Sequence, residues 1–114
     1  MPRKHSDNKS EVRKKVRALL PRLRGKRPST KIKAMQELGA LGPQASFTAA
    51  SLLSFVEDPD DLVRSAAMWA LAEIGFGDVS VSKAVRELLT QDTPGRDPYT
   101  RSRVYWILEH IECN

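Results

Sequence analysis

The clearest pattern along the chain is an apolar stripe at helical spacing over residues 60–74. Apolar residues recur there at i, i+4 and i+7, which is typical of a helix with one buried face. We expect Asp60 or Asp61 to cap the first turn and Gly75 to end the helix in a left-handed conformation. The stripe consists of Val63, Ala67, Ala70, Leu71 and Ile74.

This stripe belongs to a repeat. At an offset of 33 residues, segment 18–42 falls on segment 51–75 without a gap. A weaker third copy covers 84–111, and its second half matches at an offset of 37. The four extra residues fit an enlarged loop in "TQDTPGRDPYT", which is rich in Pro, Gly and Asp.

Each copy predicts two helices. The second helices of the outer copies lie in "PSTKIKAMQELGALG" and "DPYTRSRVYWILEHIE". In the first of these, Ser29 is the expected cap and Gly42–Pro43 the stop. The partner helices are expected at approximately 10–24, 45–57 and 80–91, with a kink at Pro21.

These elements predict an all-α fold, a right-handed α-solenoid of about three stacked helical hairpins, because no period-2 alternation indicates strands. The repeats are expected at approximately 10–42, 45–75 and 80–112, within a domain of residues 10–114 that follows a disordered basic tail, 1–9.

Charge is distributed unevenly along the 114 residues. Residues 1–33 hold 13 Lys/Arg and two acids, whereas residues 34–114 hold 6 basic and 12 acidic residues. The basic end suggests an anionic partner or head-to-tail self-association. The single Cys113, the charged N-terminal segment and the short apolar runs favour a cytoplasmic protein without a membrane span.

The segment "DPDDLVRSAAMWALAEIG" resembles the HEAT repeat, in the short form named after phycobilisome lyases. In that family an Asp in the turn and an Arg on the second helix form a ladder between repeats. The resemblance therefore implies a structural role for Asp58 and Arg64, with Lys31 and Arg101 at the equivalent basic positions. It also implies that the second helices line a concave surface.

Trp69 lies off the buried stripe, and Trp106 and Gln36 occupy the same place in the other copies. On the concave surface that the resemblance implies, these three residues form a row flanked by Met68 and Tyr105. Two interpretations are open. The tryptophans either seal contacts between neighbouring repeats or line a groove that binds a peptide or helix, since Trp, Tyr and Met are enriched at interface centres.

The basic segment also allows more than one interpretation. It is a solubilising cap of the stack, a sequence-blind contact to nucleic-acid phosphates, or a contact to an anionic membrane surface or acidic protein. The candidate phosphate contacts are Arg13, Lys14, Lys15, Arg17, Arg22, Arg24, Lys26 and Arg27.

Catalytic motifs are missing from the sequence. His5, His110 and Cys113 have no metal-ligand spacing, and there is no phosphate-binding glycine loop and no Ser-His-Asp set. The sequence therefore predicts a non-catalytic module, without cofactor or metal, that binds another protein through the concave helix face. The alternatives are non-specific nucleic-acid binding and, more weakly, a phycobilin-lyase-like accessory role.

Overall fold

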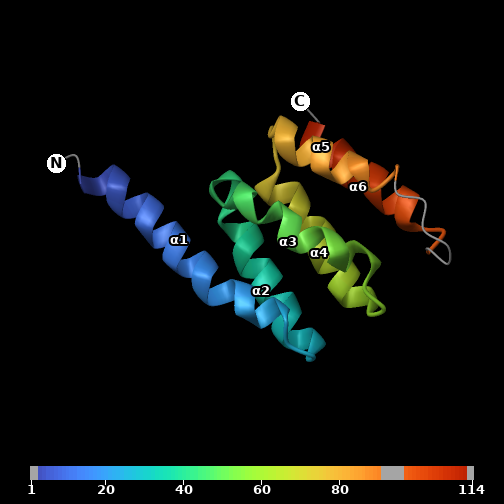
Figure 1. Ribbon diagram of the computed structural model, residues 1–114, viewed down its shortest axis with the longest axis horizontal. Coiled ribbons are helices and arrows are strands. Elements are labelled where there is room, and N and C mark those ends of the chain that lie inside the picture. Colours follow the sequence, from blue (N-terminus) through green and yellow to red (C-terminus); the bar gives the residue numbers. More distant parts are fainter. Residues whose placement is uncertain (1–2, 91–96, 113–114) are drawn as a thin grey trace.

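The computed structural model describes residues 3–90 and 97–112, with the side chains of residues 3–8 left undescribed. Within these residues every regular element is helical (Figure 1). The elements are α1 (Arg3–Leu23), α2 (Pro28–Ala40), the 3₁₀ helix η1 (Gly42–Thr48), α3 (Ala49–Leu53), the 3₁₀ helix η2 (Ser54–Glu57), α4 (Asp61–Ile74), α5 (Val79–Glu87) and α6 (Thr100–Glu112).

The helices form two layers. In one layer α2 packs on α4 and α4 packs on α6, so the second helices of the three hairpins are neighbours. In the other layer, α1 packs on η1 and α3 packs on α5. Each first helix also packs on the second helix of its own hairpin: α1 on α2, α3 on α4 and α5 on α6 (Figure 1). The predicted all-α solenoid of three helical hairpins is therefore confirmed.

The repeat extends to the packing of individual residues. The five stripe positions of α4 are buried, and α6 buries the five residues that lie 37 positions later. The apolar residues among them belong to one continuous core, which also includes the buried face of α1. The four-residue insertion therefore does not disturb the register of the third repeat. The α6 residues are Thr100, Val104, Ile107, Leu108 and Ile111.

Helix α4 begins at the predicted cap. One carboxylate oxygen of Asp60 accepts hydrogen bonds from the backbone N–H groups of Leu62 and Val63, at 2.8 and 3.1 Å. Helix α2 begins differently, so the predicted cap at Ser29 is wrong. Its N-cap is Arg27, without a side-chain bond, because Pro28 presets the helical backbone in the first turn.

Both predicted glycine stops lie at the ends of their helices, but their backbone conformations differ. Gly42 has a φ of +66° and directly follows the C-cap of α2, as expected. The left-handed conformation predicted for Gly75 is wrong, because its φ is −96°. Gly75 instead provides space: a Cβ there would lie 2.5 Å from Cγ1 of Val81 and 2.8 Å from the carbonyl oxygen of Leu71.

The first helices differ more from prediction. The expected helix 45–57 is divided into η1, α3 and η2, with a non-helical residue at Ala45, whose carbonyl accepts a bond from the Thr48 hydroxyl at 2.7 Å. Helix α1 starts at Arg3, inside the stretch 1–9 expected to be disordered, since residues 3–20 contain no Gly or Pro that would interrupt a helix. Pro21 lies in the last turn of α1, so its missing hydrogen bond falls at the helix end rather than at a mid-helix kink.

Candidate functional site

Large side chains are exposed along the outer face of the second helices. Leu62 is 68% exposed, Trp69 39% and Trp106 37%, and Tyr105 and Gln36 are also exposed. We call these five residues the second-helix surface. Trp and Tyr carry large apolar rings with a polar atom at the edge, so their partial exposure provides contact area for a macromolecule.

Trp69 packs on the neighbouring repeat and is also partly exposed. A Cβ placed on Gly39 of α2 would lie 2.9 Å from Cε3 and Cη2 of the Trp69 ring, and closer still to Cζ3. The ring therefore packs directly on the α2 backbone and seals the contact between the first two repeats. The rest of the ring faces solvent, which leaves it free for a partner.

The other predicted groove residues are placed less uniformly. The ring of Trp106 stacks on His110 of the same helix, with ring centroids 3.9 Å apart. Tyr105 and Gln36 are exposed, whereas Met68 is half-buried and packs against the core. Met68 therefore contributes to the packing against the core.

A shallow groove lies between α2 and α4 on this surface. Its volume is about 700 Å³, and most of its lining side chains are apolar. Leu62 was not among the residues predicted for the groove. The lining residues are Ile32, Gln36, Leu62, Ser65, Ala66 and Trp69.

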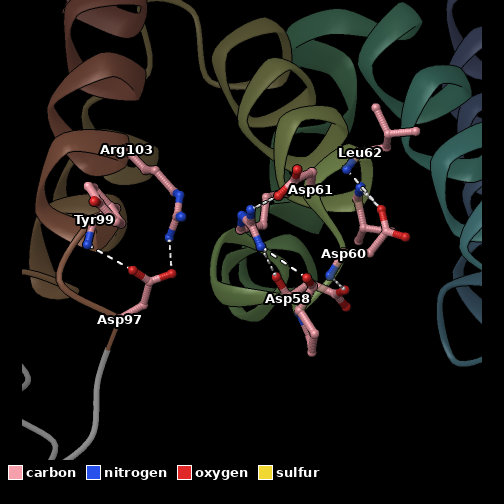
Figure 2. A network of polar contacts seen from close by, with 10 residues as sticks. Asp58, Asp60, Asp61, Leu62, Asp97, Tyr99 and Arg103 are labelled. Carbon is pink, nitrogen blue, oxygen red and sulfur yellow. Dashed lines mark hydrogen bonds and ion pairs between the residues drawn. The ribbon is translucent and has the colours of Figure 1, made fainter.

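Arg64 fixes the turn that precedes α4. Its guanidinium donates hydrogen bonds to the backbone carbonyls of Asp58 and Pro59, at 2.8 and 3.1 Å, and pairs with the carboxylate of Asp61 (Figure 2). One planar cation thus binds three acceptors of a single turn. This arrangement positions the start of α4, including Leu62.

Asp58 links the first two repeats. Its carboxylate accepts a bond from the backbone N–H of Asp60 at 2.9 Å and pairs with the ammonium of Lys31 at 3.5 Å. The side chains of Lys31 and Asp58 are 18% and 12% exposed, so this ion pair is partly shielded from solvent. Lys31 also lies over the ring of Phe55, with its nitrogen 5.5 Å from the ring centroid.

The third repeat uses a different arginine from the one predicted. Arg101 is exposed, whereas Arg103 pairs with Asp97 at 2.8 Å (Figure 2). The reason is the position of the acid. At the offset of 37 residues, Asp97 corresponds to Asp60 and not to Asp58. Arg64 lies six residues after Asp58, and the arginine six residues after Asp97 is Arg103. The Tyr99 N–H, 2.8 Å from the carboxylate, and Arg103 hold the pKa of Asp97 below its usual value.

The predicted phosphate contacts all face solvent. All eight cations on α1 and the following loop are exposed, and Arg22 lies 3.8 Å from Glu37. Among the described residues, the other seven make no ion pair with an acid. The segment thus presents a concentrated positive charge to solvent.

An acidic side chain joins the last two helices. Glu112 of α6 accepts bonds from both terminal nitrogens of Arg86, at 2.7 and 3.0 Å, and from the Ser82 hydroxyl at 2.7 Å. Arg86 and Ser82 lower the pKa of Glu112. The described residues contain no cluster of three His, Cys, Asp or Glu side chains arranged to hold a metal ion, and His5 and Cys113 lie outside the described side chains.

The layered hairpins and their shared core define the class of protein as an α-solenoid. A family model for HEAT repeats matches residues 16–109, and the chain belongs to the HEAT-repeat family. The match is to HEAT repeats in general, so the phycobilisome-lyase subtype stays a prediction. Neither the curated proteins nor the solved structures compared with the chain gave a match. No helix in the described part of the chain is long and apolar enough to cross a membrane.

Proposed function

We propose that this protein is a non-catalytic interaction module that binds a partner protein through the second-helix surface. HEAT repeats commonly mediate protein interactions and are typically non-catalytic. The observation that carries the proposal is the groove between α2 and α4, in which exposed Leu62 and Trp69 stand at either end of one helix wall.

The wall formed by α4 has the shape of a notch. Leu62 and Trp69 are seven residues apart, so they lie on the same face of the helix, separated by about 10 Å along its axis. Between them stand the small side chains of Ser65 and Ala66, which also line the groove. A large apolar side chain of the partner fits between the two projecting residues, where it displaces water from both.

The opposite wall completes the pocket for a partner segment. Ile32 and Gln36 are four residues apart on α2 and line the same groove. Gln36 supplies an amide donor and acceptor beside a mostly apolar lining. A helix or extended segment with one or two large apolar residues therefore matches this groove in size and chemistry.

Replacing Leu62 by Asp tests the proposal. Leu62 is largely exposed, so Leu62→Asp should leave the fold intact while placing a charge in the groove. The matched control is Val79→Asp, because Val79 is 82% exposed and lies outside the groove. In affinity capture from an extract of the source organism, partners lost with Leu62→Asp and retained with Val79→Asp support the proposal. Partners that respond equally to both changes contradict it.

Binding to nucleic-acid backbones is a second candidate, supported by the exposed, mostly unpaired cations that follow residue 12. It predicts binding to duplex DNA of any sequence, with an affinity that falls steeply with salt because each contact releases counterions, at a log–log slope of about −0.9 per phosphate. Lys14→Glu and Lys15→Glu together should lower that slope. Failure of duplex DNA and RNA to bind at low salt excludes this candidate.

A further inference from the structure

A second groove, of about 700 Å³, lies at the other layer of the molecule, between α1 and η1. Its floor is apolar: Val16 is buried, Val12 and Leu20 are partly buried, and Phe47 of η1 is 60% exposed at the opposite side. Such a large exposed phenylalanine beside other apolar residues is typical of an interaction surface rather than of a fold contact.

Cations line the same groove. Lys9, Arg13 and Arg17 recur every four residues on α1, directly beside the apolar series at 12, 16 and 20. The two series run parallel for about 12 Å, or somewhat more than two helical turns. All three cations are exposed, and none forms an ion pair with another described residue.

We propose that the groove between α1 and η1 binds an acidic amphipathic helix of a partner protein. Apolar side chains of that helix, at i and i+4 or i+7, pack on Val12, Leu20 and Phe47. Its flanking carboxylates face Lys9, Arg13 and Arg17. The proposal concerns a surface and a partner chemistry different from those of the second-helix surface.

The composition of the groove separates this ligand from nucleic acid. A phosphate backbone pairs with the cations but has no apolar group to cover Phe47 and Leu20. An acidic amphipathic helix satisfies both series at once. Charge attraction speeds the encounter, and burial of the apolar floor holds the complex together.

Two synthetic peptides of identical composition test the ligand chemistry. In one, Leu residues recur at i, i+4 and i+7 of a Glu- and Ala-rich helix, and in the other the same residues are scrambled. Fluorescence anisotropy with the full chain should show the amphipathic peptide binding about 10-fold tighter or more, because only it presents a continuous apolar face. Equal binding of the two peptides overturns the proposal.

Two matched pairs of variants test the location. Phe47→Ala should weaken binding of the amphipathic peptide about 10-fold or more, whereas Phe76→Ala, which changes another exposed phenylalanine (55%) outside the groove, should not. Arg13→Glu should weaken it more than Lys14→Glu, which makes the same charge change on the neighbouring, non-lining residue. Circular dichroism checks that each variant remains helical. If the members of each pair behave alike, the groove is not the binding site.

Other occupants give different results in the same assay. Duplex DNA or phosphatidylserine-containing vesicles that bind more tightly than the amphipathic peptide, with equal losses in Arg13→Glu and Lys14→Glu, indicate a general anion-binding surface and overturn the proposal. Analytical ultracentrifugation of the protein without peptide shows whether a second copy of the chain occupies the groove. Self-association that is abolished by Phe47→Ala also overturns it.

Discussion

At the scale of single residues, Arg64 is the side chain that most directly determines the turn before α4. It binds two backbone carbonyls and one carboxylate with its side chain only 19% exposed. We expect Arg64→Ala to lower the free energy of unfolding by about 1–3 kcal/mol, because the partly buried carbonyls of the turn lose their donors.

Arg101 provides the control for this prediction. It occupies the register position of Arg64 in the third repeat, yet it is exposed. Arg101→Ala should therefore change the free energy of unfolding by no more than about 0.5 kcal/mol. Urea denaturation of the two variants measures the difference, and equal losses would show that the turn contacts of Arg64 do not stabilise the protein.

Gly39 and Trp69 form a second pair whose coupling is measurable. A methyl group on Gly39 meets the Trp69 ring, so Gly39→Ala should destabilise the protein by about 1–3 kcal/mol. In a Trp69→Ala background the ring is gone, and the same change should become neutral or stabilising by up to about 1 kcal/mol, because Ala favours the helix more than Gly.

A double-mutant cycle by urea denaturation gives the interaction energy of this pair. If Gly39→Ala costs the same free energy with and without the tryptophan ring, Trp69 does not seal the contact between α2 and α4. The ring would then have no packing role beside its exposed face.

At the scale of elements, we expect the start of α6 to respond to acid. The pKa of Asp97 is lowered in the folded state, so the stabilisation from this carboxylate is fully present above its unfolded pKa of about 4. It is lost as the pH falls through the lower folded pKa. The melting temperature of the protein should therefore fall on acidification below about pH 5.

Asp97→Asn isolates this contribution. Asn accepts the Tyr99 N–H but forms no ion pair with Arg103 and does not titrate. The variant should melt lower than the unchanged protein at pH 7, and the two melting temperatures should converge toward low pH, with a residual acid dependence from groups such as Glu112. Thermal melts followed by circular dichroism across this range test it; parallel curves would exclude a role for Asp97.

The second helices could be predicted from the sequence more fully than the first helices. Their stripes, the Asp60 cap and the stop at Gly42 depend on local patterns, so they follow from spacing alone. No pattern in the sequence marks the division of 45–57 into η1, α3 and η2, or the non-helical backbone at Ala45. The role of Gly75 depends on Val81, which only the tertiary structure brings near.

At the scale of the whole molecule, part of the candidate site was also predictable. The repeat placed Trp69, Trp106 and Gln36 at equivalent positions, and all three are exposed on the second helices. The groove itself was not predictable, because it depends on the spacing between α2 and α4. Leu62 and Phe47 were missed for the same reason, since their exposure is a property of the assembled stack.

The two grooves lie on different layers of the solenoid. The second-helix groove is lined by α2 and α4, and the basic groove by α1 and η1, with no lining residue in common. The two proposed sites are therefore built from separate sets of residues. If both proposals hold, the protein joins two partner segments through one stack of helices.

The central claim is that the second-helix surface binds a partner protein, and site-specific photo-crosslinking tests it most directly. Benzoylphenylalanine replaces Leu62 in the groove or, as control, Val79, which is also apolar and exposed but lies outside the groove. On irradiation in cells of the source organism, position 62 should form a defined adduct with a protein that position 79 does not capture. Absence of an adduct at position 62, or the same adducts at both positions, would contradict the claim.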